Sequence, residues 1–322
     1  LFIITCDVIR RVTGHSFFMK YRYPAMLHTM PKNLVIFGGF AIGLILMVSI
    51  YGVLHARRVY VRQDPVVIEK SSSLPGLKIA LIADLHLGYN STKSHVRKIV
   101  DTINSQNVDL VCIAGDLFDN DYNAIKDPDE VADILSDIKS RYGTYACWGN
   151  HDVSEKILAG FTFPQKETIV RDGRFTEFLH HAGITMLEDE TVCINNAFYL
   201  VGRRDKDMAK KEQLPRKTFA EITEPLDPSL PIIVMDHQPG ELSEASDAGV
   251  DLDLSGHTHD GQMFPANLVV HFLWENACGV LKKGAMTSIV TSGAGVWGPA
   301  MRVGTNNEVV IANVSFDPAT DQ

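Results

Sequence analysis

The chain has 322 residues, and its 30 Lys and Arg against 39 Asp and Glu give a formal net charge of −9. This length suits one large domain or two small ones, and a content of 45% hydrophobic and 21% charged residues excludes a chain that is disordered throughout. The acidic balance disfavours a basic nucleic-acid binder, so no nucleic-acid partner is expected. The five cysteines are widely spaced without a CxxC pair, which excludes a disulfide framework and a zinc finger.

Charge is distributed unevenly along the chain. Residues 1–62 hold eight basic residues and one acidic residue, a net +7, so the remaining residues carry −16. A basic, apolar front and an acidic remainder indicate a membrane-associated segment followed by a soluble domain.

Residues 33–54 contain no charged side chain, and about 20 apolar residues suffice for a helix to span a bilayer. A buried core helix fits the length and the flanking charges poorly, and a cleaved signal peptide is disfavoured because about 30 residues precede the segment. We therefore predict a transmembrane helix at 33–54. Residues 1–32 are interpreted as the end of an earlier apolar segment plus a basic loop, in a chain truncated at its N-terminus. Five basic residues precede the helix and four follow it, so the orientation in the membrane stays open.

The soluble part alternates between strand and helix patterns. We expect a linker at 55–76, because Ser71, Ser72, Ser73 and Pro75 occur there, and one domain at 77–322. Short apolar runs predict strands at 77–83, 108–114 and 143–148, with helices at 92–106 and 128–139 between them. Further strands are expected at 184–187, 197–201, 231–235, 252–255, 288–291 and 309–314, and a helix at 172–181. Strand–helix–strand order followed by many strands predicts an α/β fold in which a second sheet packs on the first.

Metal-capable side chains follow five of these strands. In open α/β sheets, sites form beyond the carboxyl ends of strands, so the five loops are expected to converge. Each motif alone is weak, but five in order predict a two-metal site. Asp and His with one amide suit Mn²⁺, Fe²⁺, Zn²⁺ or Co²⁺. The motifs are Asp84-x-His86, Gly115-Asp116-x-x-Asp119, Gly149-Asn150-His151-Asp152, Asp236-His237 and Gly256-His257-x-His259.

This series of motifs resembles the calcineurin-like metallophosphoesterase family, and more closely its bacterial membrane-anchored or exported branch. The resemblance covers about residues 77–314 and implies a four-layer α/β/β/α sandwich. It also implies that Asp84, His86, Asp116 and His259 hold one metal ion. Asp116, Asn150, His237 and His257 would hold the other, with Asp116 bridging the two. Asp260 departs from the Gly that is usual there in this branch, but this removes no ligand.

The expected chemistry is hydrolysis at phosphorus by a hydroxide that the two metals share. His151 is the candidate acid for the leaving oxygen, and the resemblance implies that Asp119 holds its other ring nitrogen. The basic segment 203–217 either meets an anionic substrate or is an ordinary solvated loop, and we favour the loop. Phe264, Trp274 and Trp297 either line a pocket beside the site or pack in the core, and we favour the core and assign them no role.

Three functions are compatible with these features. The leading hypothesis is a membrane-anchored, two-metal phosphoesterase that cleaves a phosphodiester or pyrophosphate bond. Its substrate would be lipid-linked, as for enzymes that resemble UDP-diacylglucosamine pyrophosphatases. The first alternative is a broad-specificity phosphatase or phosphodiesterase acting on soluble envelope phosphates. The second is a non-catalytic, metal-bound membrane scaffold, which the complete ligand set disfavours.

Overall fold

The structure is a computed structural model that describes residues 32–155, 157–158, 161–162 and 171–317. The chain divides into two units, residues 1–54 and 55–322. In the first unit, the described residues form helix α2 (Lys32–His55). Its stretch Val35–His55 has a mean hydropathy of 2.2 and is long and apolar enough to cross a membrane. The helix predicted at 33–54 is therefore present, whereas the apolar segment predicted before it lies outside the described residues.

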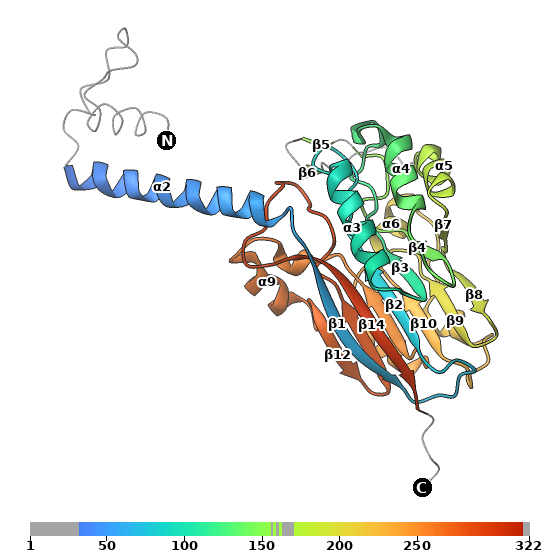
Figure 1. The fold of residues 1–322 in the computed structure, drawn as a ribbon. Coiled ribbons are helices and arrows are strands. Elements are labelled where there is room, and N and C mark those ends of the chain that lie inside the picture. The colour runs from blue at the N-terminus through green and yellow to red at the C-terminus, as the bar shows by residue number, and fades with distance from the viewer. Residues whose placement is uncertain (1–31, 156, 159–160, 163–170, 318–322) are drawn as a thin grey trace. The chain divides into compact units, whose positions relative to one another are not determined.

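The first sheet of the second unit has the strand order β1-β14-β2-β3-β4-β7 (Figure 1). β2, β3, β4 and β7 run parallel, β14 pairs antiparallel with β2, and β1 runs parallel to β14 at the edge. The strands are β1 (Val59–Ile68), β2 (Leu77–Ile82), β3 (Leu110–Ala114), β4 (Thr144–Cys147), β7 (Ile184–Met186) and β14 (Asn307–Phe316).

The prediction of a linker at 55–76 is wrong for residues 59–68, because β1 lies there. Asp64, Val66 and Ile68 are buried at alternate positions, whereas the residues between them are exposed. An edge strand with one covered face lacks the continuous apolar run by which the central strands were found. The folded domain therefore begins upstream of residue 77.

Three helices cover the outer face of the first sheet (Figure 1): α3 (Lys93–Ser105), α4 (Pro128–Ser136) and α5 (Gly173–His181). In α3, Val96, Ile99, Val100 and Ile103 are buried at helical spacing. The side chain of Thr92 caps this helix by accepting a hydrogen bond from the backbone N–H of His95. These helices therefore arise where their sequence periodicity predicted them.

The second sheet has the order β12-β13-β11-β10-β9-β8, in which β13, β11, β10 and β9 run parallel to one another and the edge strands β12 and β8 pair antiparallel with them. Its strands are β8 (Glu190–Ile194), β9 (Phe198–Gly202), β10 (Ile232–Met235), β11 (Leu252–Ser255), β12 (Gly279–Lys283) and β13 (Met286–Val290). The remaining elements are β5 (Ile157–Leu158), β6 (Phe161–Thr162), α6 (Lys206–Glu212), α7 (Phe219–Thr223), α8 (Leu242–Asp247), α9 (Ala266–Leu273), η2 (Tyr122–Ala124) and η3 (His259–Gly261).

Three apolar clusters define the layers. The first lies between α3, α4, α5 and the first sheet, the second lies between the two sheets, and the third packs α7 and α8 on the second sheet. Ile79 and Leu81 of β2 point into the inter-sheet cluster, while Ala80 and Ile82 face the helices, as the period of a strand requires. The fold is thus the expected α/β/β/α sandwich.

Candidate metal centre

The candidate ligands lie just beyond the carboxyl ends of five strands. Asp84 and His86 follow β2, Asp116 follows β3, and Asn150 follows β4. His237 follows β10 of the other sheet, and His257 and His259 follow β11. The structure brings all seven side chains together, because the parallel strands of both sheets end at the same edge of the sandwich.

One group of donors consists of Asp84, His86 and His259, which are all buried. The Nε2 atoms of His86 and His259 lie 3.1 Å apart, and Oδ1 of Asp84 lies 3.7 Å from Nε2 of His259. Three ligand atoms therefore point at one small volume.

The other group surrounds Nε2 of His237. This atom lies 3.1 Å from Oδ2 of Asp116, 3.1 Å from Oδ1 of Asn150 and 3.2 Å from Nδ1 of His257. Nδ1 of His237 is 2.8 Å from the carbonyl oxygen of Ala114, to which it donates its hydrogen. Nε2 thus faces two side-chain oxygen atoms and a ring nitrogen at close range, an arrangement that a bound cation stabilises.

Asp116 lies between the two groups. Its Oδ2 is 3.8 Å from Nε2 of His86 in the first group, as well as 3.1 Å from Nε2 of His237 in the second. Its Oδ1 accepts a hydrogen bond of 2.8 Å from the backbone N–H of His151. One carboxylate oxygen is thus shared by both groups, as a bridging ligand requires.

The pKa values reflect an excess of negative charge at these atoms. Burial opposes ionisation of Asp116, but His237 and His151 overcome it and hold its pKa well below the ordinary value. Burial likewise opposes a charge on His237, but Asp116 and Asp84 raise its pKa well above the ordinary value. Burial raises the pKa of Asp84 to about 6. The buried donors thus attract positive charge strongly, and their oxygen and nitrogen atoms fit divalent metal ions.

The backbone at the site is strained. Asp84, His86, Asp116, His257 and His259 all have φ between 45° and 72°, a region that non-glycine residues enter at a cost of about 1–3 kcal/mol each. Close approach also requires glycine: a Cβ at Gly149 would lie 2.2 Å from Oδ1 of Asp116, and one at Gly256 would lie 2.7 Å from Oδ2 of Asp84. The surrounding packing holds this geometry, which is typical of functional sites.

The expected contact between Asp119 and His151 is absent among the described residues, and Asn120 replaces it. Nδ1 of His151 lies 2.5 Å from Oδ1 of Asn120, whereas Oδ1 of Asp119 lies 3.4 Å from Nδ1 of His86. Asn120 has φ of 59°, which turns the chain so that successive side chains face different histidines. Sequence reasoning missed Asn120 because a motif gives the order of residues but not which of two adjacent side chains in a loop faces His151. Burial lowers the pKa of His151 to about 4.

Neighbouring acids hold the loops rather than facing solvent. Asp152 is buried and accepts hydrogen bonds from the backbone N–H groups of Phe118 and Gly149.

The basic segment 203–217 contacts the loop that carries Asn150. Lys211 donates to the backbone carbonyl of Asn150 at 3.0 Å and to Glu155 at 2.9 Å. The segment 203–217 is therefore neither a free solvated loop nor a wholly substrate-facing one, because its basic residues form ion pairs and backbone contacts.

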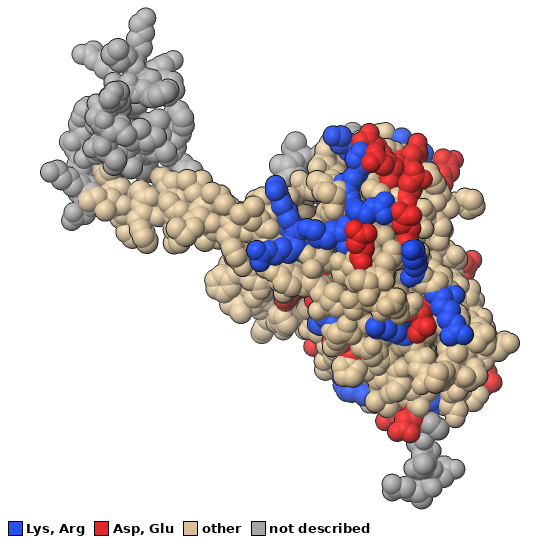
Figure 2. All heavy atoms as spheres, viewed as in Figure 1, with Lys and Arg blue, Asp and Glu red and all other residues tan. Residues whose placement is uncertain are grey.

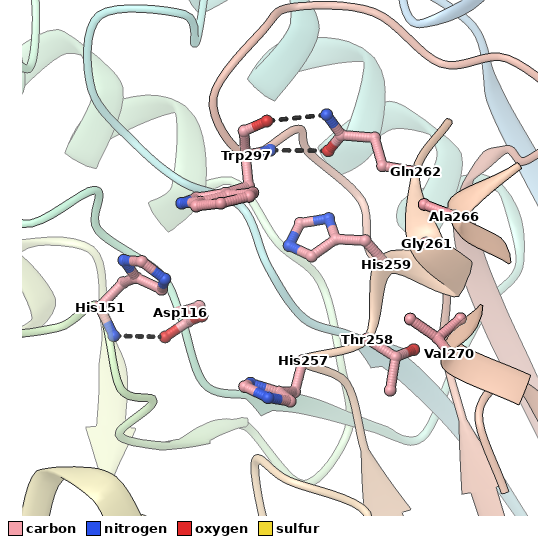
Figure 3. Close-up of a pocket in the computed structure, with 10 residues that line it drawn as sticks. All are labelled: Asp116, His151, His257, Thr258, His259, Gly261, Gln262, Ala266, Val270 and Trp297. Carbon is pink, nitrogen blue, oxygen red and sulfur yellow. Dashed lines mark hydrogen bonds between the residues drawn. The ribbon is translucent and has the colours of Figure 1, made fainter. Parts of the chain in front are cut away.

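The two groups open into a pocket of about 300 Å³ (Figure 3). Figure 3 shows His151 and Asp116 on one side of this pocket, His259 and Val270 on the other, and Trp297 above them. Ala266 and Val270 of α9 form an apolar part of the wall. The interpretation of the three aromatic residues as core is wrong: Trp297 lines the pocket, the ring of Trp274 lies 5.4 Å from that of His257, and Phe264 is exposed.

The calcineurin-like phosphoesterase family model matches residues 77–261, which include every candidate ligand. An uncharacterised metallophosphoesterase of Helicobacter pylori is 32% identical over 77% of this chain and 62% of its own length. A transmembrane protein with a metallophosphoesterase domain from Danio rerio is 28% identical over 82% of this chain and 59% of its own. The UDP-2,3-diacylglucosamine pyrophosphatase LpxG of Chlamydia muridarum is 24% identical over 61% of this chain and 67% of its own length.

The fold, the shared carboxylate and these matches define a dinuclear metallohydrolase scaffold. The chain belongs to the calcineurin-like phosphoesterase family. It spans only about three fifths of the length of the Helicobacter and Danio relatives.

Proposed function

We propose that the protein is a membrane-anchored phosphoesterase that hydrolyses a phosphodiester or pyrophosphate bond, with a lipid-linked phosphate as its substrate. The observation that carries the proposal is the position of Asp116. One of its oxygens is shared by two groups of buried metal ligands, and it lines the pocket together with His151.

Each side chain has a definite task in this proposal. Asp84, His86, His259 and Asp116 would hold one divalent ion, and Asp116, Asn150, His237 and His257 the other. Two such ions supply Lewis acidity and lower the pKa of bound water toward neutrality. Trp297 and two residues of α9 line the pocket in which the phosphorus would lie.

His151 is proposed to transfer a proton to, or hydrogen-bond, the leaving oxygen. Asn120 fixes its ring by accepting from Nδ1–H, and the doubly protonated ring would donate its second proton from Nε2 on the opposite side. Because Asp119 lies against His86, we propose that it positions this metal ligand rather than the acid.

The lipid-linked substrate is supported by two features. Helix α2 has the length and composition of a membrane span, which would hold the pocket near lipid. The relative from Chlamydia muridarum is named for cleavage of a diacylglucosamine pyrophosphate, which is both a lipid and a pyrophosphate.

The full chain in detergent micelles, stripped of metal and supplied with Mn²⁺, tests the proposal. It should hydrolyse a UDP-linked lipid pyrophosphate faster than a model phosphodiester or a phosphomonoester. Turnover of the two simple esters alone would retain the chemistry and reject the lipid substrate. Absence of Mn²⁺-dependent turnover of all three would contradict the enzymatic proposal and favour a scaffold.

A further inference from the structure

Helix α9 exposes an unusually apolar surface. Residues 264–274 contain no Lys, Arg, Asp or Glu, and α9 has no buried residue. Leu268 is 62% exposed and Phe272 is 89% exposed, and Phe264, Val269 and Leu273 add to the same surface. Contiguous exposed groups of this kind mark contacts with a protein or a membrane rather than ordinary solvated surface.

The opposite side of α9 belongs to the metal pocket, because Ala266 and Val270 line it. The helix is held in place at its N-terminal end, where the backbone N–H of Phe264 donates to the carbonyl oxygen of Val303 at 2.8 Å. His271 adds a contact of 2.8 Å with Asp260, which follows the ligand His259. One short helix thus has a face toward the metals and a face toward the surroundings.

The path of the chain near His55 indicates what the exposed face of α9 contacts. Nε2 of His55 lies 3.1 Å from the carbonyl oxygen of Thr305 and 2.9 Å from Oδ1 of Asn306. The chain therefore passes from α2 into the folded domain beside the loop 303–306, to which Phe264 is also bound. Phe264, just before α9, and His55, the last residue of α2, thus contact the same loop.

The distribution of charge near α9 is the next observation. Arg57 and Arg58 are exposed where the chain enters β1. On the face drawn in Figure 2, basic side chains lie near the place where β1 begins, and the surface where Figure 1 draws α9 is mostly uncharged. An apolar face next to basic residues matches the acyl chains and the anionic headgroups of a lipid surface.

We propose that the exposed face of α9 lies in the lipid–water interface, so that the metal pocket opens toward the bilayer and receives the phosphate of a lipid along this helix. Leu268, Val269, Phe272 and Leu273 would contact acyl chains, while Ala266 and Val270 form the wall past which the headgroup reaches the metals. The inference rests on the proposed anchoring in a membrane, but its test does not depend on turnover.

The test uses the full chain in vesicles of phosphatidylglycerol and brominated phosphatidylcholine, in which bromine quenches only tryptophans that contact acyl chains. Three single substitutions act as reporters: Phe272→Trp in α9, Phe40→Trp in α2 and Val67→Trp as the control. Val67 is exposed in β1 and lies about 26 Å along this strand from Val59, at about 3.3 Å per residue. The emission of the parent chain is subtracted, and bound Mn²⁺ verifies that each variant is folded.

We expect bromine to remove most of the added emission at residues 40 and 272 and little at residue 67. Iodide in the water should quench residue 67 and spare residue 272. Leu268→Trp repeats the measurement if Phe272→Trp does not fold.

Three results would overturn the inference. Quenching of residue 272 by iodide alone would place α9 in water. Protection of residue 272 from both quenchers would mean that a protein surface, such as α2 or a second copy of the chain, covers it. Absence of bromine quenching at residue 40 would reject the membrane anchoring as well, which separates failure of the proposed function from failure of this inference.

Discussion

The protein contains two clusters of ionisable side chains with opposite designs, one partly buried and one buried. In the arginine cluster, Arg203 and Arg216 both bind Asp236 and Glu241 at 2.7–3.1 Å, so two cations face two anions. In the metal centre, no Lys or Arg of the described residues donates a hydrogen bond to Asp84 or Asp116, and ring nitrogens of neighbouring histidines lie only 3.1–3.2 Å apart.

The difference shows where the protein completes its own charge balance and where it does not. The arginine cluster needs nothing from outside, because each buried charge has an opposite partner. The metal centre combines buried carboxylates, converging donors and left-handed backbone, which are costly without cations. A dense cluster of buried charges indicates a ligand site only when the protein supplies no side chains of opposite charge to balance it.

The largest expected effect comes from Asp116→Asn. The amide keeps the shape but removes the charge that faces both ligand groups, so turnover should fall by more than about 100-fold. Losing a side chain that merely orients a metal ligand already costs about 10–100-fold. Steady-state rates and bound Mn²⁺ are the measurements, and full activity with normal metal content would refute the bridging role.

His151→Ala should lower kcat by about 10²–10⁴-fold, because this is the usual contribution of a general acid. Bound metal should stay at the level of the unaltered protein, because the side chain of His151 is not assigned to either ion. A wild-type rate on substrates with a poor leaving group would show that His151 is not the acid.

In the arginine cluster, Arg203→Met should lower the free energy of unfolding by about 3–5 kcal/mol, the usual result of leaving a buried charge without its partner. Arg203 is buried, and its guanidinium also stacks 3.7 Å above the ring centre of Phe219. Urea denaturation measures the loss. Metal content per folded molecule should be unchanged, and a loss of metal would mean that the two clusters are coupled.

Asp119→Ala and Asn120→Ala separate the roles of two adjacent residues. Asp119→Ala should weaken metal affinity by about 10–100-fold, because it removes the partner of His86. Asn120→Ala should lower kcat about 10-fold and shift its pH profile, since it frees the ring of His151, while metal affinity stays normal. The reverse pattern in metal titrations would restore the pairing of Asp119 with His151.

The smallest effect concerns Glu241. Burial acts to raise its pKa, but hydrogen bonds from Arg216, Lys206 and Arg203 lower it to about 2. A lowered carboxyl pKa stabilises the fold above the ordinary value of about 4.5 and loses this contribution as the pH falls toward about 2. Glu241→Gln should therefore destabilise the metal-free protein less at pH 3 than at pH 6, as thermal unfolding can measure. A difference that grows toward acid would contradict the stabilising role.

Much of the architecture follows from local sequence. Central strands such as β2 and β3 are apolar throughout because both of their faces are covered, and α3 is amphipathic because one of its faces packs on the sheet. The ligand types were equally readable, since Asp and His repeatedly follow such strands. These local patterns predicted two packed sheets and a cluster of metal-capable residues at the strand ends, while the four layers and the ligand set were implied by the family resemblance.

Other features depend on contacts that the sequence does not encode locally. β1 becomes a strand by pairing with β14, about 250 residues further on, and Asn120 faces His151 only because of the turn in its loop. The apolar run of α9 could equally have been core. Only the tertiary structure left it exposed beside the metal pocket, because burial is decided by what packs against a residue rather than by its own hydrophobicity.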